Sequence, residues 1–155
     1  MNRPAFVLVV GVTLLGACAR PPAPAQPAAP EVTYLLADPA STLPFSDAVR
    51  VGHLLFLSGQ IGTDSTGALV AGGIEAETRQ TLENIKAVLE RNGSSMDKVI
   101  KCTAMLLDIS EWGTMNGIYV TYFPVHKPAR SAFGASGLAL GARLELECWA
   151  TVGTD

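Results

Sequence analysis

The sequence contains few of the residues from which metal sites and nucleic-acid interfaces are built. Its 155 residues include only two histidines, His53 and His126, which lie far apart without a further ligand at zinc-binding spacing. Charged residues make up only 16% of the chain, and its formal net charge is −3. A mildly acidic chain has no electrostatic attraction for phosphates, so these shortages argue against both a metal ion and a nucleic-acid partner.

The N-terminal apolar run is too short to span a bilayer. Residues 5–15 are largely apolar, follow Arg3 and precede small residues, which is the pattern of a signal peptide. The segment "LGAC", residues 15–18, resembles the lipobox of bacterial lipoproteins, in which the cysteine becomes the lipidated first residue of the mature chain. The alternative is a simple signal peptide followed by an incidental cysteine.

This N-terminus predicts a signal peptide over residues 1–17, a proline- and alanine-rich linker over residues 18–30 that begins with a lipidated Cys18, and one domain over residues 31–155. Ala19 stands where an aspartate retains some lipoproteins in the inner membrane. We therefore expect a periplasmic protein that is held at the outer membrane by its lipid alone. Cleavage before Cys18 removes one positive charge, so the formal charge changes from −3 to −4.

Apolar periodicity divides the domain into strands and helices. Residues 48–62 are predicted to form two strands with a turn near Gly52, and residues 99–109 form a largely apolar strand. Residues 74–91 carry apolar side chains at helical spacing, and "NG" follows as a stop signal. Ser110 is positioned to cap a second helix. The predicted core positions of the two helices are Ile74, Leu82, Ile85, Val88 and Leu89, then Met115, Ile118, Tyr119 and Tyr122, with the second helix ending near Phe123.

Residues 130–136 and 142–152 are predicted to form the last two strands. The order of elements indicates an α+β domain in which two helices pack on one face of a mixed sheet. Along the last strand, one face mixes acids with a large aromatic side chain, which is too apolar for open solvent and too charged for a sealed core. This mixed face predicts a subunit interface with a partly solvated site. The two faces are Leu144, Leu146, Cys148 and Ala150 on one side and Glu145, Glu147, Trp149 and Thr151 on the other.

Two cysteines, Cys102 and Cys148, remain in the predicted domain. Export would allow them to be oxidised. Each lies in an apolar, strand-like run, where buried free cysteine is common. We therefore expect two free thiols rather than a disulfide.

Five segments along the domain carry a resemblance to a known family. They are "LSGQIG", "ETRQTLENIKAVLERNGSSMDKVIKCTAMLLDISEW", "MNGIYVTYFP", "KPARSAFG" and "RLELECWA". In this order they resemble the signature segments of the RidA/YjgF family, the reactive-intermediate imine deaminases. The resemblance implies a chorismate-mutase-like α+β fold, a homotrimer with sites in the clefts between subunits, and no metal or organic cofactor. It also implies hydrolysis of small 2-imino or enamine acids, such as 2-iminobutanoate, to 2-keto acids and ammonia.

The resemblance also assigns roles to individual residues. Arg130 corresponds to the arginine that binds the substrate carboxylate, and Glu145 to the glutamate that works with the hydrolytic water. The sequence departs from the family pattern where Phe45 replaces a tyrosine, Asp47 a glutamine and Lys127 an aromatic residue. The positions expected to line the substrate cleft are Phe45, Ser58, Gly59, Asn116 and Ala132, the last in place of a frequent cysteine.

These residue types suit the implied chemistry. Arginine offers a planar fork that matches a carboxylate, and binding the carboxylate fixes the neighbouring imine carbon. Glu145 can then orient a water molecule and transfer protons to the departing amine. The alternatives are an interface salt bridge between Arg130 and Glu145 or Glu147, a trimer cleft that binds small carboxylates or keto acids without turnover, and a holdase-like role. Ribonuclease activity, claimed for some relatives, fits an acidic exported domain poorly.

Overall fold

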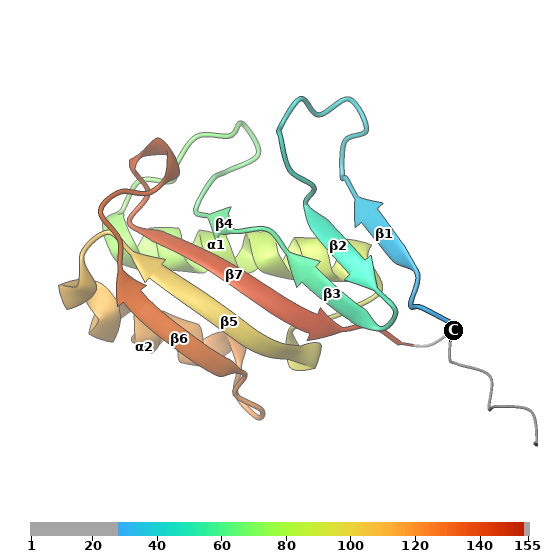
Figure 1. The fold of residues 1–155 in the computed structure, drawn as a ribbon. Coiled ribbons are helices and arrows are strands. Elements are labelled where there is room, and N and C mark those ends of the chain that lie inside the picture. The colour runs from blue at the N-terminus through green and yellow to red at the C-terminus, as the bar shows by residue number, and fades with distance from the viewer. Residues whose placement is uncertain (1–27, 154–155) are drawn as a thin grey trace, which may run out of the picture.

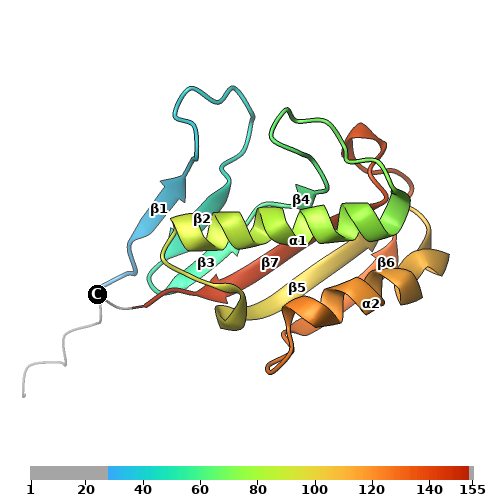
Figure 2. The ribbon, with the colours of Figure 1, turned by 180° about the vertical axis from the view of Figure 1, so that it is seen from behind.

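The computed structural model of the protein describes residues 28–153, which form one mixed sheet with two helices on one of its faces (Figures 1 and 2). The predicted signal peptide, residues 1–17, and the predicted lipidation site Cys18 lie outside the described residues. Residues 28–30, the end of the predicted linker, are exposed and have no secondary structure. Neither helix within residues 28–153 has the length and apolar character needed to cross a membrane.

The sheet has the order β1-β2-β3-β7-β5-β6, and the short strand β4 also pairs with β7. Every neighbouring pair is antiparallel except β5 and β6, which run parallel. Parallel strands require a crossover connection, and the second helix supplies it. The strands are β1 (Val32–Leu35), β2 (Ala48–Val51), β3 (Leu54–Leu57), β4 (Gln60–Ile61), β5 (Val99–Leu106), β6 (Ala129–Gly134) and β7 (Leu144–Thr151).

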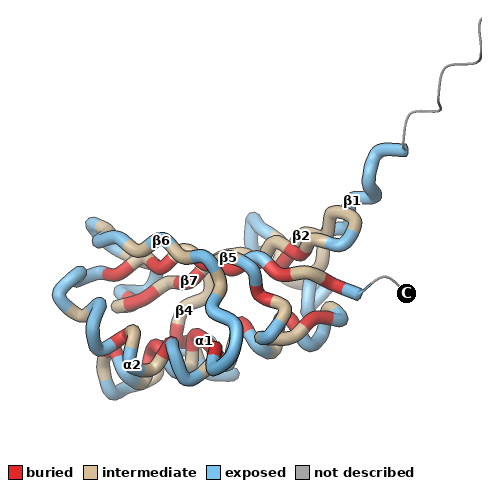
Figure 3. Tube along the Cα trace, turned by 90° about the horizontal axis from the view of Figure 1, so that it is seen from below, coloured by how far each residue is buried: buried red, intermediate tan, exposed pale blue. Residues whose placement is uncertain are grey.

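The two helices, α1 (Gly73–Arg91) and α2 (Trp112–Tyr122), confirm the predicted α+β class and the placement of both helices on one face. The core lies between this face and the helices, where the buried segments concentrate (Figure 3). All five predicted core positions of α1 are buried. In α2, Met115 and Tyr119 are buried, whereas Ile118 and Tyr122 are half-buried against the core.

The predicted cap of α2 is wrong. Ser110 lies inside a short 3-10 turn, Ile109–Glu111, that precedes the helix. Asp108 has the extended backbone that a capping residue requires, and its carboxylate accepts a hydrogen bond from the backbone N–H of Ser110 at 2.9 Å. Hydrogen bonds from Ser110 hold the pKa of Asp108 below its usual value, so the cap stays ionised at neutral pH.

The expectation of two free cysteines is also wrong. The register of β5 and β7 places Cys102 directly opposite Cys148 on the helix-facing side of the sheet, with 4.1 Å between their Cα atoms, and the two form a disulfide. Directly opposed residues of antiparallel strands are close enough for this bond, whereas the apolar pattern of each strand says nothing about the register. Both cysteines are fully buried, so the bond lies in the core.

Strand β1 was not predicted, because most of its length is exposed and shows no alternation. In the described part of the chain it is an edge strand whose single neighbour is β2. Asp47 closes the loop between these strands: its carboxylate accepts a hydrogen bond from the backbone N–H of Ala37, and its own N–H donates to the carbonyl of Leu35 at 2.9 Å. This loop carries Phe45, so Asp47 contributes to the position of a predicted site residue.

Candidate active site

Arg130 lies on the edge strand β6, on the side of the sheet that faces the helices. It is the register partner of Cys102, whose side chain is buried under the helices. Its guanidinium carbon lies 4.5 Å from the centroid of the Tyr119 ring, and Nη2 donates a hydrogen bond to the Asn116 side-chain oxygen at 2.6 Å. Stacking and hydrogen bonding together fix the plane of the guanidinium group before any ligand binds.

Helix α2 forms the platform for this arginine. Trp112, Asn116 and Tyr119 follow each other at spacings of four and three residues, so they lie on one helix face. The Trp112 ring centroid is 5.8 Å from the guanidinium carbon. Apolar spacing in the sequence predicts Tyr119 simply as a core residue of the helix. The same spacing, extended to Asn116, would have shown that it shares a face with a predicted site residue.

Tyr119 itself is a buried phenol with an unusual environment. Its side chain is 7% exposed, and its hydroxyl has no hydrogen-bond partner within residues 28–153. Burial raises the pKa of Tyr119 to about 12, so the hydroxyl remains protonated at physiological pH. A buried hydroxyl without a partner is an unused hydrogen-bond donor, and such groups call for an explanation in water or ligand.

A cavity of about 460 Å³ opens beside the guanidinium group. This volume is in the range of small-molecule sites. Two of the lining residues are cations and none is an acid, so the cavity favours an anionic ligand. The lining residues are Asn116, Gly117, Tyr119, Val120, Phe123, Lys127, Pro128 and Arg130.

Arg130 has no carboxylate partner in the described part of the chain. The ion pair that the structure contains within residues 28–153 joins Arg143 to Glu111. No salt bridge joins Arg130 to Glu145 or Glu147 within residues 28–153, so the predicted alternative, an interface salt bridge, would require a second chain. The remaining guanidinium N–H groups are available to an acid from elsewhere.

Glu145 lies on the opposite face of the sheet. Its partners across β5 and β4 are Met105 and Ile61, which alternate with the buried positions. The carboxylate lies against Gly59: a Cβ built on this glycine would be 1.9 Å from Oε1 of Glu145. A side chain at position 59 would displace the Glu145 carboxylate, so the turn that contains Gly59 shapes the position of the carboxylate.

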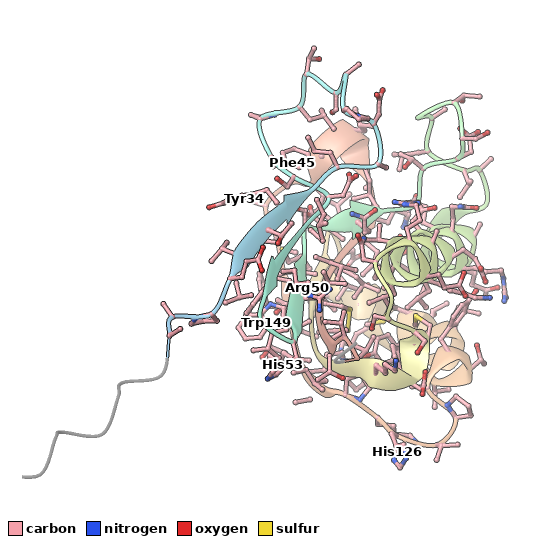
Figure 4. The ribbon with its side chains drawn as sticks, turned by 90° about the vertical axis from the view of Figure 1, so that its right-hand side faces the viewer. Tyr34, Phe45, Arg50, His53, His126 and Trp149 are labelled. Carbon is pink, nitrogen blue, oxygen red and sulfur yellow. A yellow bond between two sulfur atoms is a disulfide. The ribbon has the colours of Figure 1, made fainter. Side chains whose placement is uncertain are left out.

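Ser58 connects the turn that contains Gly59 to the loop that carries Phe45. The Ser58 hydroxyl donates a hydrogen bond to the carbonyl of Ser46 at 2.6 Å, which joins the turn to the loop that follows β1. Phe45 precedes Ser46 in this loop, and its side chain is 52% exposed (Figure 4). Gly59, which lies against Glu145, is therefore linked through Ser58 to the loop that carries Phe45.

The predicted site residues thus form two groups that one chain does not bring together. Arg130, Asn116 and the half-buried Ala132 belong to the helix-facing side, because Arg130 and Ala132 pair with Cys102 and Ala104 of β5. The group around Glu145 belongs to the other side.

The face that carries Glu145 is the mixed acid–aromatic face predicted from the last strand. The Trp149 indole N–H donates to Glu147 at 2.8 Å, and the Trp149 ring packs edge-on against Phe56 with 4.9 Å between ring centroids. The Lys101 ammonium donates to the Ser131 hydroxyl at 3.0 Å. Neither helix covers this face (Figure 1), and Trp149 is 39% exposed.

The start of β7 is held in place from the helix side. Arg143 pairs with Glu111, and its backbone N–H donates at 2.7 Å to the carboxylate of Glu77, a buried residue of α1. These contacts anchor the strand two residues before Glu145. Its backbone position is therefore fixed by α1 and by the turn before α2.

The two histidines lie apart and exposed on separate parts of the molecule (Figure 4). Among residues 28–153, no three side chains of the metal-binding types lie close enough to hold a metal ion.

Comparison with known proteins identifies the family. The sequence profile of the family described as endoribonuclease L-PSP matches residues 36–152. The chain is 41% identical over 116 residues to the 2-iminobutanoate/2-iminopropanoate deaminase of Mus musculus, a match that covers 74% of this chain and 86% of the relative. The crystal structure of RidA from an Antarctic Psychrobacter shares 35% identity, with a TM-score of 0.69 over 74% of this chain and 93% of that chain. The structure of Escherichia coli TdcF with bound serine shares 28% identity, with a TM-score of 0.71 over 78% of this chain and all of that chain. Together with the fold, these matches confirm the resemblance seen in the sequence: the chain belongs to the RidA/YjgF family.

Proposed function

We propose that this protein is a deaminase that hydrolyses small 2-imino or enamine acids to 2-keto acids and ammonia. The observation that carries the proposal is Arg130, a stacked and oriented guanidinium that lines a ligand-sized cavity and has no acid partner within residues 28–153. The name of the mouse relative supports imine deaminase activity. The serine bound to Escherichia coli TdcF supports a site for a small molecule with one carboxylate and one nitrogen.

The geometry suits a hydrolysis that relies on positioning. Arg130 binds the substrate carboxylate with its remaining N–H groups and so fixes the imine carbon beside it. Glu145 orients the attacking water and passes a proton to the leaving nitrogen. The C=N bond is replaced by C=O, ammonia leaves, and no electrons are exchanged with an external partner.

We further propose that the site is completed between the subunits of a homotrimer. Arg130 and Glu145 lie on opposite faces of the sheet in one chain, so a second chain must supply one of them. The uncovered acid–aromatic face, with Trp149 and Phe56 on it, provides a surface of the kind found at subunit interfaces. A trimer arranged head to tail would form three equivalent clefts.

An ammonia-release assay tests the deaminase proposal. An amino-acid oxidase generates 2-iminobutanoate in place, and the purified domain should release ammonia well above the spontaneous rate. Arg130→Ala should remove this excess. Equal rates with and without the wild-type protein would contradict the proposal.

A trimer that binds small carboxylates or keto acids without turnover is the second candidate. The apolar Phe45 favours it, because no hydroxyl is present at this position to assist a reaction. Titration with 2-oxobutanoate separates the two candidates: binding without ammonia release indicates a binding module. RNA incubated with the same preparation serves as a control for the nuclease description of the family, which the formal charge of −3 does not favour.

We also propose that the protein is exported and anchored in the outer membrane through a lipid on Cys18. The signal-like N-terminus motivates the proposal, and the core disulfide supports it, because disulfides persist in oxidising compartments. Mass spectrometry of the membrane fraction should find a mature chain that begins with an acylated Cys18. A full-length chain, or a soluble one that begins elsewhere, would refute it.

A further inference from the structure

The cavity beside Arg130 contains a second cation. Lys127 lines it together with Arg130, and the other polar side chains of the lining are Asn116 and Tyr119. No lining residue is acidic. A single carboxylate would neutralise Arg130 and leave Lys127 facing the same space without a counter-charge.

Lys127 is not engaged elsewhere in the described part of the chain. No carboxylate within residues 28–153 lies within salt-bridge distance of Lys127, and its ammonium group makes no hydrogen bond there. Lys101 differs, because its ammonium group donates to the Ser131 hydroxyl on the other face. The ammonium of Lys127 is therefore free to meet a ligand.

The two cations lie within reach of one small molecule. They are three residues apart, a distance that an extended chain spans in at most roughly 10 Å, and lysine adds a flexible four-carbon stem. The same cavity is also lined by the apolar side chains of Val120, Phe123 and Pro128. The arrangement suits a short carbon chain with an acid group at each end.

We propose that the preferred substrate of this site is a dicarboxylic 2-imino acid of four or five carbons. The proposal rests on the deaminase function proposed above and names its substrate class. Arg130 binds the carboxylate next to the imine, where its planar fork fixes the reacting carbon. Lys127 binds the distal carboxylate as a mobile point charge. Water adds to the imine carbon, the C–N bond breaks, and ammonia leaves a 2-keto dicarboxylate.

The test compares two imines on the same protein. An L-glutamate oxidase with catalase supplies 2-iminoglutarate, a general amino-acid oxidase supplies 2-iminobutanoate, and semicarbazide traps the imine that remains. The decrease in trapped product when the protein is added measures the enzyme-dependent hydrolysis of each imine. Wild type should favour 2-iminoglutarate, and Lys127→Met should lower the ratio of the two rates roughly tenfold, the size of one partly exposed charge-assisted contact. Lys86→Met, which removes an exposed lysine of α1 outside this cavity, should leave the ratio unchanged.

Different experimental results would contradict the dicarboxylate inference and the deaminase proposal. If 2-iminobutanoate is hydrolysed and the ratio of the two imine hydrolysis rates is the same in wild type and Lys127→Met, the dicarboxylate inference is overturned. The deaminase proposal would still stand. If neither imine is hydrolysed, calorimetric titration decides. Tighter binding of 2-oxoglutarate than of 2-oxobutanoate, lost in Lys127→Met, would support a site for two acid groups, whereas equal affinities would overturn it.

Discussion

Arg130 is held in its orientation by neutral groups rather than by an acid. The Tyr119 ring stacks on the face of the guanidinium, and the Asn116 side-chain oxygen accepts a hydrogen bond from one of its N–H groups. Neither contact neutralises the positive charge, so the full charge is available to a substrate carboxylate. An arginine that serves only structure would instead be expected to have its charge paired.

Replacing Arg130 separates charge from geometry. Arg130→Lys keeps the charge but loses the fork, and charge-assisted bonds contribute on the order of 1.5–3 kcal/mol each. We expect kcat/KM for imine hydrolysis to fall roughly ten- to a hundredfold, and further in Arg130→Ala. Size-exclusion chromatography with light scattering on the same samples should show unchanged assembly. Loss of activity that only follows loss of assembly would instead indicate an interface salt bridge.

Gly59 offers a way to move Glu145 without removing it. A Cβ at position 59 would meet the Glu145 carboxylate at 1.9 Å, so Gly59→Ala must push this side chain aside. A misplacement of about 1 Å at a reacting group can cost roughly a hundredfold in rate, and we expect a loss of this size in kcat. Gly137→Ala is the matched control, because a Cβ there meets no atom within 4 Å. Wild-type turnover in Gly59→Ala would show that the position of Glu145 does not matter for the reaction.

At the scale of elements, the disulfide between Cys102 and Cys148 ties β5 to β7. It joins residues 46 positions apart, and closing a loop of this length stabilises the folded state by roughly 2–4 kcal/mol. The double variant Cys102→Ala/Cys148→Ala should lose about this amount in urea unfolding. Alanine is chosen because a serine hydroxyl at either buried position would add a polar group without a partner.

The wild-type protein provides the control for this prediction. Both sulfurs are fully buried, so a reductant should leave the native protein unchanged and lower the unfolding midpoint only when urea exposes the bond. Identical midpoints with and without reductant would mean that the two cysteines are not paired in solution.

Apolar periodicity predicts the helices and strands that bury one face. It does not predict strands with little burial or contacts that depend on the register between strands. Helix α1 and strands β5 and β7 have strong apolar patterns, and all three were predicted. Strand β1 buries almost nothing, so its sequence has no pattern to detect. The disulfide depends on which residue of β5 lies opposite Cys148, and strand pairing is a property of the folded sheet rather than of either strand.

The candidate site was predictable residue by residue but not as an arrangement. Arg130 and Glu145 were identified in the sequence, yet nothing local indicates that they lie on opposite faces of the sheet. That result requires the parallel pairing of β6 with β5, which places Arg130 beside Cys102 and not beside Met105. Lys127 was noted only as a departure from the family, because its place in the cavity depends on the turn before β6.

At the scale of the whole molecule, the separation of Arg130 from Glu145 predicts complementation between subunits. Arg130→Ala and Glu145→Gln should each be inactive alone. If each cleft takes its arginine from one subunit and its glutamate from the next, random mixed trimers contain both intact groups in about a quarter of their clefts. Unfolding and refolding the two variants together should therefore restore about a quarter of wild-type activity. Refolding each variant alone controls for recovery, and light scattering on the mixture should give three times the chain mass. If the mixture stays inactive while trimers form, both groups must come from the same chain, and the cleft between subunits would not be the site of the reaction.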